Sequence, residues 1–464
     1  MTRERTVVAV VPSPGGESFM LDQPRDRPPH VQWRIDALGA APGAAPFSAL
    51  GDVPLPAGAV KTAGTALFDA LATNGAVAWG LGELLQHQAA LGPRSLYLLL
   101  AQGLEGAHAL PWEALYDAQG RRFPALEAGW SLGRMLDAST LGRPDSYRLD
   151  PPLRILAVVA AAGIPNGDEW QALLRAFDHP DVDLPAACHL QVLVADPSLK
   201  QQIDGHVPRG SLTIECDFLS WDRLESRMES FRPHFLHFFC HGDEVSGRSR
   251  LELDTRSSFV RPESGPGLVL ELEAFRTLYN RHPGTWLVNL NCCLGAAPPS
   301  GSTSLAADLV TEGFPAVVGM REVVANVDAN RFTTAFYRSA LRLVRRALEP
   351  AVGGNGESPS KELEWASAVN DARHRLASEK GSLADAGSRK EWTLPVIYVQ
   401  PKPFVFEGRS APTTPERARL EAALATLETK RAEILDLGLE DAMLAEVLRP
   451  IDDEIAELRR RLAD

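Results

Sequence analysis

Between residues 154 and 401 the sequence alternates short apolar runs with longer amphipathic segments, and this alternation constrains the fold more than any other feature. Proline, glycine or polar residues bound the apolar runs, as in buried strands, and the segments between them have helical spacing. Strands that alternate with helices pair into a mostly parallel sheet flanked by helices, which predicts an α/β fold. The predicted strands are 154–161, 190–195, 211–216, 233–240, 285–291, 315–320 and 394–401, and the predicted helices are 168–178, 221–231, 271–280, 303–313, 326–348 and 362–377.

The sequence on either side of this α/β region has a different character. Residues 1–60 are rich in proline, glycine and alanine, and they predict one short strand at 6–11 among loops. Residues 66–102 then predict a helix followed by a buried strand. Residues 411–464 are rich in alanine, leucine, glutamate and arginine, and they predict an α-helical hairpin that turns near Gly438.

The second helix of the predicted hairpin carries an apolar stripe that must be covered, because exposed stripes of this kind cause aggregation. Pro450 interrupts this helix and disfavours a long straight coiled-coil dimer. We therefore expect the first helix, with Leu420, Leu427 and Ile434, to pack against the stripe. Whether the hairpin only packs on its own chain or also docks an activating or recruiting protein stays open. The stripe has coiled-coil spacing and consists of Leu444, Leu448, Ile451, Ile455, Leu458 and Leu462.

Charge and composition disfavour several classes of function. The formal net charge is −13 over 464 residues, whereas nucleic-acid binding needs a basic face. The run at 6–11 is too short for a signal peptide, and no run reaches the length that spans a membrane. The five cysteines are odd in number and unevenly spread, which is not the pattern of a disulfide framework. We expect a cytoplasmic protein that binds neither nucleic acid nor membrane.

The predicted strand 233–240 ends unusually, with His241 followed by Gly242. Histidine changes protonation near neutral pH and suits a general acid or base, and glycine permits a sharp turn and close backbone approach. Sites in α/β sheets lie at the carboxyl ends of strands, so we predict a catalytic role for His241. His237 lies within the strand, where a histidine satisfied in the core is the better interpretation.

The predicted strand 285–291 ends in Cys292 and Cys293, ahead of a loop rich in glycine, proline and serine. Cysteine is a strong nucleophile, and a nearby histidine can convert its thiol to a thiolate. One predicted helix separates this strand from 233–240, so a right-handed crossover would place the two strands side by side. The pattern predicts a Cys/His dyad, and the alternative is that both cysteines are small apolar core residues.

Other chemistry is disfavoured at this pair of motifs. A zinc site is disfavoured because neighbouring residues on a strand point to opposite faces and no CxxC spacing occurs. The arginine of a cysteine phosphatase is missing, since Pro298 and Pro299 stand in its place. A reducing compartment opposes a disulfide between Cys292 and Cys293. A Cys/His dyad needs no metal or organic cofactor, so none is expected.

Taken in order, the motifs resemble the CHAT-domain proteins, caspase-like cysteine peptidases of the group that includes caspases, metacaspases and separases. LHFFCHGD at 236–243 is similar to the family's histidine motif, and LVNLNCCLGA at 287–296 is similar to its cysteine motif. LPWEALYD at 110–117 resembles the family's Pro-Trp-Glu segment. The resemblance implies a caspase-like sheet and divides the chain into an N-terminal strand and loop segment (1–60), the N-terminal part of the CHAT-like region (61–150), a catalytic core (151–405) and the hairpin (411–464).

The family's cysteine motif has a polar residue two positions before the nucleophile and a small residue directly before it. Asn291 and Cys292 meet this pattern if Cys293 is the nucleophile. Gly295 fits the family's motif ending slightly better if Cys292 is the nucleophile. We predict Cys293, with Cys292 as the second choice.

The resemblance implies that His241 draws the thiol proton or assists the leaving amine, while the Cys293 sulfur attacks the scissile carbonyl. The backbone N–H groups of Gly242 and Cys293 are the expected donors to the oxyanion. Substrate contacts are predicted for Asp243 and Asn291. The candidates to orient His241 are Asp243, Glu244 and Asp254.

The leading prediction is a caspase-like cysteine endopeptidase that cleaves protein or peptide substrates. The resemblance implies a bacterial defence or cell-death setting in which a sensor or partner activates the enzyme. One alternative is a catalytically inactive scaffold of the same fold that acts by protein–protein binding, and another is a small-molecule thiol hydrolase. The presence of both His241 and a cysteine at the nucleophile position argues against the scaffold.

Overall fold

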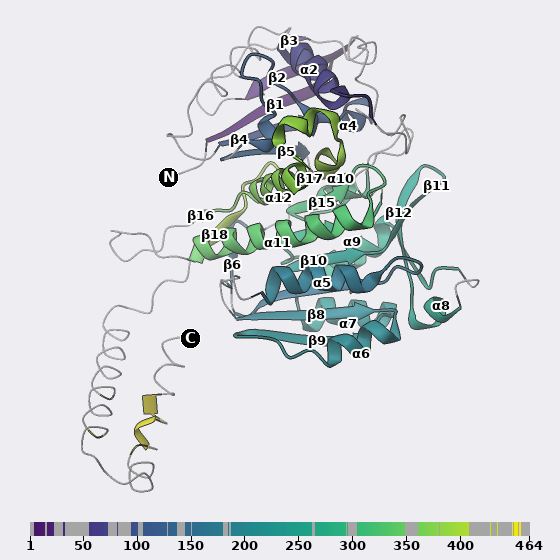
Figure 1. Ribbon diagram of the computed structural model, residues 1–464, viewed down its shortest axis with the longest axis vertical. Coiled ribbons are helices and arrows are strands. Elements are labelled where there is room, and N and C mark those ends of the chain that lie inside the picture. Colours follow the sequence, from purple (N-terminus) through teal and green to yellow (C-terminus); the bar gives the residue numbers. More distant parts are fainter. Residues whose placement is uncertain are drawn as a thin grey trace. The chain divides into compact units, whose positions relative to one another are not determined.

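In the computed structural model, the alternating runs of the sequence form a long, mostly parallel sheet flanked by helices (Figure 1), which confirms the predicted α/β class. No helix within the part of the chain described below is long and apolar enough to cross a membrane. The described residues are 4–13, 16–22, 31–32, 55–72, 94–100, 105–127, 129–136, 144–149, 151–179, 187–261, 265–293, 304–348, 361–379 and 381–407, together with Leu81, Leu184, Gly295, Leu427, Ile434, Leu448, 450–452 and 454–455.

Within these residues the sheet has 12 strands, in the order β3-β2-β1-β4-β5-β17-β15-β14-β10-β7-β8-β9. The predicted strands of the α/β region are all present in it. The strands are β1 (Glu4–Ser13), β2 (Gly16–Asp22), β3 (Val31–Gln32), β4 (Arg94–Leu100), β5 (Trp130–Leu136), β7 (Leu153–Val159), β8 (Cys188–Val194), β9 (Leu212–Phe218), β10 (Phe235–Phe239), β14 (Leu287–Leu290), β15 (Ala316–Met320) and β17 (Pro395–Val399).

The sheet contains two parallel sets of strands that run in opposite directions, and β2 adds antiparallel pairs with β1 and β3 at one edge. The strands from β15 to β9 are parallel to one another, and so are β1, β4 and β5. Strand β17 joins the two sets, because it pairs parallel with β5 and antiparallel with β15. A strand from near the end of this unit therefore lies in the middle of the sheet.

Helices cover the sheet as the amphipathic segments predict, and Figure 1 shows α5 and α11 in front of it with α7 and α9 behind. Their apolar stripes are buried, as in Leu173 of α5 and Phe336 of α11. The helices are α2 (Ala59–Ala72), α4 (Glu105–Ala109), α5 (Asn166–Phe177), α6 (Pro197–Asp204), α7 (Trp221–Ser230), α8 (Arg256–Val260), α9 (Leu272–Arg281), α10 (Leu305–Thr311), α11 (Asn326–Leu348) and α12 (Trp365–Glu379).

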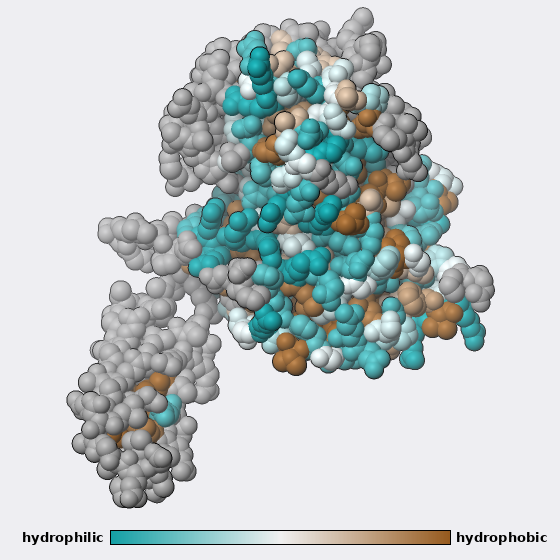
Figure 2. Space-filling model, viewed as in Figure 1, coloured by the Kyte–Doolittle hydropathy of each residue, from teal (hydrophilic) through white to brown (hydrophobic). Residues whose placement is uncertain are grey.

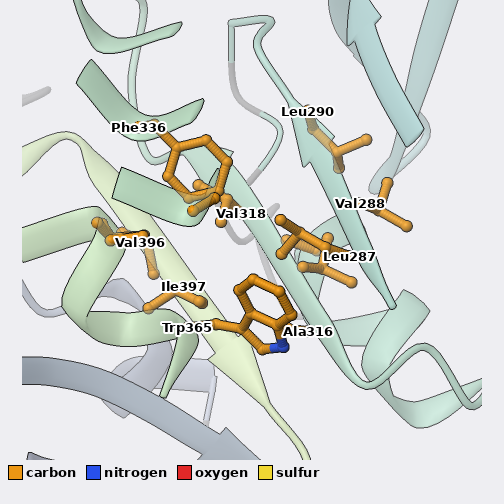
Figure 3. Packing of buried hydrophobic residues seen from close by; sticks show 14 of the residues in the cluster. Leu287, Val288, Leu290, Ala316, Val318, Phe336, Trp365, Val396 and Ile397 are labelled. Atoms are coloured by element: carbon orange, nitrogen blue, oxygen red, sulfur yellow. The ribbon is translucent and has the colours of Figure 1, made fainter. Parts of the chain in front are cut away.

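The core of this unit is continuous across the strands that carry the two candidate catalytic motifs. Every residue of β10, β14, β15 and β17 is buried, as expected of strands covered on both faces. Phe336 of α11 and Trp365 of α12 pack against apolar side chains of β14, β15 and β17 (Figure 3). Burial of each aliphatic or aromatic side chain stabilises the folded state by about 1.5–3 kcal/mol. The strands that end in the two motifs are therefore held firmly by this core.

Two small sheets accompany the large one. Strand β11 (His241–Val245) begins directly after β10 and pairs with β12 (Arg248–Leu253), which pairs with β13 (Leu268–Leu270). The second small sheet contains β16 (Lys361–Glu362), β18 (Val405–Glu407) and β6 (Tyr147–Arg148). Neither small sheet is predicted from the sequence. The sheet of β11, β12 and β13 places His241 at the start of a paired strand.

Contacts divide the chain into two units, one of residues 1–348 with 361–406 and the other of 349–360 with 407–464. The segments 1–60 and 61–150 belong to the first unit, as does 151–405 apart from residues 349–360, and the sheet runs through all three. The face of this unit in Figure 2 is mainly hydrophilic, with small separate hydrophobic patches.

In the second unit the described residues carry part of the predicted apolar stripe. Leu448, Ile451 and Ile455 are helical and buried, whereas Pro450, Asp452 and Glu454 are exposed. Leu427 and Ile434 are helical and half-buried. Leu420, Leu444, Leu458 and Leu462 lie outside the described residues. The burial pattern agrees with the stripe, and the hairpin itself stays a prediction.

Candidate active site

The two strands that end in the histidine and cysteine motifs are neighbours, as predicted from the single crossover between them. Strands β10 and β14 pair in parallel, with Phe238 opposite Leu290. The pairing continues past the end of β14, where the Asn291 N–H donates to the Phe238 carbonyl at 2.9 Å. His241 and Cys293 therefore follow two adjacent strands at the same edge of the sheet.

Gly242 brings the two motifs into direct backbone contact. A β-carbon at this position would lie 1.8 Å from the carbonyl oxygen of Cys293 and 3.5 Å from the Cys292 sulfur. Any side chain larger than hydrogen would thus overlap the Cys293 peptide. Glycine is required here for close approach of two backbones, whereas the predicted close approach is that of the Gly242 N–H to a substrate.

The imidazole of His241 is half-buried and held by a backbone carbonyl. Its Nε2 lies 2.7 Å from the carbonyl oxygen of Ala162, in the loop between β7 and α5. A carbonyl oxygen only accepts hydrogen bonds, so Nε2 carries the proton and Nδ1 is left as the basic nitrogen. No side-chain signal in the sequence identifies Ala162, because its contribution is a backbone oxygen.

Asp254 acts on this loop rather than on the histidine ring. It is buried, and one carboxylate oxygen accepts the Ala162 N–H at 2.7 Å while the other accepts the Ser258 hydroxyl at 3.0 Å. Asp254 thereby fixes the residue whose carbonyl holds His241. The other two candidate orienting residues lie on β11, where Asp243 pairs with Arg250 at 3.1 Å and Glu244 is exposed. The predicted substrate contact of Asp243 stays a prediction.

The two adjacent cysteines have different environments. Cys292 is 3 % exposed, and its thiol hydrogen-bonds with that of Cys240 in the interior. Cys293 is half-buried. Burial raises the pKa of the Cys293 thiol, while backbone N–H groups of Val324 and of Cys293 itself hydrogen-bond to the sulfur and lower it in part. Cys293 is thus the more accessible sulfur, and its role as nucleophile stays a prediction.

Asn291 points into the interior. Its side-chain nitrogen donates to Glu169 Oε1 at 3.0 Å and to Thr333 Oγ1 at 2.9 Å, and the residue is 1 % exposed. Its predicted contact with a substrate stays a prediction, and the observed contacts are structural. His237 is fully buried and its Nδ1 accepts from the Asn289 amide at 3.1 Å, which confirms it as a core histidine.

The Pro-Trp-Glu segment supplies one side of a buried ion pair. Glu113, which lies in the short helix η3 (Trp112–Ala114), receives two hydrogen bonds from the Arg134 guanidinium, at 3.0 and 2.8 Å. Burial by itself raises the pKa of Glu113, but Arg134 holds it below its ordinary value. The motif therefore stabilises the junction between η3 and β5.

Within the described residues, no group of three or more histidine, cysteine, aspartate or glutamate side chains could hold a metal ion. Cys240 and Cys292 are in thiol contact, and His241 is bound to Ala162.

Comparison with known proteins identifies the family. The CHAT domain model matches residues 62–380. A chain of the Saccharomyces cerevisiae separase–securin complex is similar, with 13% identity and a TM-score of 0.33, over 68% of this chain and 16% of that chain. The Arg-specific cysteine proteinase gingipain R is similar over 73% of this chain and 68% of that chain, with 9% identity and a TM-score of 0.37.

Comparison with curated protein sequences gives no match. The chain spans 16% of the separase chain that it resembles. The CHAT domain match, in contrast, includes both the histidine and the cysteine motif. Because that match at 62–380 covers more than half of the 464 residues, the chain belongs to the CHAT-domain family.

Proposed function

We propose that the protein is a cysteine endopeptidase in which Cys293 is the nucleophile and His241 is the general base. The observation that carries this proposal is the packing of Gly242 on the Cys293 carbonyl, because it brings the residue after His241 onto the peptide of the candidate nucleophile. The hydrogen bond between the imidazole and Ala162 supports it further. With Nε2–H bound to Ala162, Nδ1 is available to accept a proton.

The reaction then follows from these positions. Burial raises the pKa of the Cys293 thiol, so the resting site holds a thiol, and its proton passes to His241 Nδ1 as the sulfur attacks the scissile carbonyl. The N–H groups of Gly242 and Cys293 stabilise the oxyanion, an effect of about 3 kcal/mol per donor. His241 returns the proton to the leaving amine, and water then hydrolyses the thioester with His241 again as base.

The biological setting is part of the same proposal, and the resemblance to the CHAT-domain family supports it. We place the enzyme in the cytoplasm, in a bacterial defence or cell-death response, where a sensor or partner protein activates it on protein substrates. Residues 411–464 are the proposed docking arm for that protein, because they form a unit separate from the one that holds His241 and Cys293.

A catalytically inactive scaffold is the competing function, and the raised pKa of Cys293 favours it because a thiol is less reactive than a thiolate. Labelling with a set of thiol-reactive peptide probes separates the two functions. We expect Cys293 to react about 100-fold faster than Cys216, which is also half-buried but lies on β9, separated from β10 in the sheet by β7 and β8. Peptide mapping by mass spectrometry measures both rates.

His241→Ala is the matched variant for this experiment. It should remove the selectivity for Cys293, because the thiol then has no base to accept its proton. Slow and equal labelling of Cys216 and Cys293 in the wild-type protein would favour the scaffold instead.

The close approach of Gly242 to Cys293 gives a second test. Gly242→Ala should lower the rate of peptide cleavage about 100-fold, because the new methyl group must displace the Cys293 peptide by an ångström or more. Gly205→Ala is the control, since its β-carbon would have no neighbour nearer than 3.4 Å. Steady-state kinetics of both variants measure the effect, and wild-type activity in Gly242→Ala would contradict the proposed geometry.

A further inference from the structure

A buried carboxylate contacts Asn291, two residues before the candidate nucleophile. Glu169 belongs to the first turn of α5 and is fully buried. Its Oε1 accepts the Asn291 side-chain N–H at 3.0 Å and the Thr333 hydroxyl at 2.6 Å. His237 Nε2 lies 3.0 Å from the same oxygen, at an angle outside the range of a hydrogen bond. One oxygen atom thus connects α5, α11, β10 and the segment after β14.

The hydrogen bond from Asn291 to Glu169 can affect Cys293 because Asn291 and Cys293 are joined by a short stretch of backbone. Asn291 is held at its main chain by the carbonyl of Phe238 and at its side chain by Glu169. Cys293 follows two residues later in the chain. A side chain that fixes Asn291 therefore limits where the following thiol can lie.

The same turn of α5 also contacts the loop whose Ala162 carbonyl binds His241. Asn166, one turn before Glu169, forms two hydrogen bonds with the backbone of Ala161, at 3.1 and 2.9 Å. The next residue, Ala162, binds His241 through its carbonyl. Residues three apart on a helix share a face, so a single helical turn contacts the supports of both His241 and Cys293.

We propose that Glu169 is a positioning residue for Cys293, which it holds through Asn291 at a fixed place relative to His241. This inference rests on the proposed peptidase function. A buried carboxylate is expensive unless hydrogen bonds compensate it, and an apolar residue could fill the same space. The turn of α5 that contains Asn166 and Glu169 contacts the backbone of Ala161 and the side chain of Asn291.

Glu169→Ala tests the inference in the full-length protein. We expect kcat for a fluorogenic peptide to fall about 100-fold with KM little changed, because the thiol is displaced while the substrate surface stays intact. Glu169→Gln keeps an acceptor oxygen for Asn291 and should retain most of the wild-type kcat. Asn291→Ala removes the same link from the other side and should match Glu169→Ala, whereas a raised KM would indicate that Asn291 contacts the substrate.

Thr334→Val is the control for a simple loss of packing between helices. Thr334 donates to the Ala172 carbonyl of α5 at 3.1 Å and does not contact Glu169, so this variant should lose some stability and keep kcat. An equal loss of kcat in Thr334→Val and Glu169→Ala would overturn the inference, and so would an unchanged kcat in Glu169→Ala or Asn291→Ala.

A second measurement separates this inference from the proposed function. The rate of Cys293 alkylation by iodoacetamide, followed against pH, requires no peptidase activity. In Glu169→Ala the profile should move to higher pH, because a displaced sulfur loses the Val324 hydrogen bond that lowers its pKa. If the wild-type protein cleaves no peptide, the proposed function fails, and an unchanged alkylation profile in Glu169→Ala and Asn291→Ala still overturns the positioning role.

Discussion

Cys293→Ala is expected to lower the rate of peptide cleavage by roughly 10⁴-fold or more, since removal of a nucleophile leaves only binding and oxyanion stabilisation. The melting temperature should stay close to that of the wild-type protein. The Cys293 thiol is half-buried at the end of a strand, so its loss removes little packing. Steady-state kinetics with a fluorogenic peptide and differential scanning calorimetry measure the two quantities.

Cys292→Ala is the matched control, because it removes the neighbouring sulfur. This sulfur is buried against Gly295 and Cys240, so the variant should lose about 1 kcal/mol of stability through a small cavity. Its rate of cleavage should remain within tenfold of wild type. An inactive Cys292→Ala with an active Cys293→Ala would reverse the assignment of the nucleophile.

Arg134→Met is expected to lower the free energy of unfolding by about 3–5 kcal/mol, because it removes both hydrogen bonds to the buried Glu113 carboxylate and leaves it with Arg373 at 3.9 Å. Arg134 is fully buried in β5 and also donates to the carbonyls of His108 at 2.6 Å and Leu110 at 2.9 Å. Those two acceptors lose their donor as well. Urea denaturation monitored by tryptophan fluorescence measures the change.

Two variants show whether the loss comes from the buried ion pair. The double variant Glu113→Leu/Arg134→Met removes both charges and should be less destabilised than the sum of the single changes. Arg276→Met breaks an exposed pair with Glu312 and should change stability far less. A loss below about 1 kcal/mol in Arg134→Met would mean that the buried pair contributes little to the fold.

The sequence predicts the parts of the fold that rest on apolar patterning. Strands such as β10 and β14 are buried on both faces, so continuous apolar runs reveal them. Strand β5 is not predicted, although six of its residues are buried, because Gly133 and Arg134 interrupt the apolar pattern. Gly133 is required by contact, since a β-carbon there would lie 2.7 Å from the Tyr97 ring. A residue type that is required by a contact with a distant part of the chain does not show in the hydrophobic periodicity of the sequence.

The sequence predicts those residues of the candidate site that act through their side chains, but not those that act through their backbone. His241, Gly242 and Cys293 have residue types that indicate their roles, and the adjacency of their strands follows from one crossover. The carbonyl of Ala162 and the N–H of Val324 act through the backbone, which any residue supplies. The inward orientation of Asn291 depends on Glu169, more than a hundred residues earlier, and local sequence does not report such a pair.

The place of β17 in the middle of the sheet has a consequence for protein synthesis. The ribosome delivers β5 and β15 well before Pro395–Val399, so the two halves of the sheet first exist without the strand that joins them. Each half exposes an open strand edge during this interval, and edges of this kind invite aggregation and chaperone binding. Pairing of β17 with β5 closes a long loop and is slow for that reason. The nascent chain therefore cannot complete its sheet until residue 399 has left the ribosome.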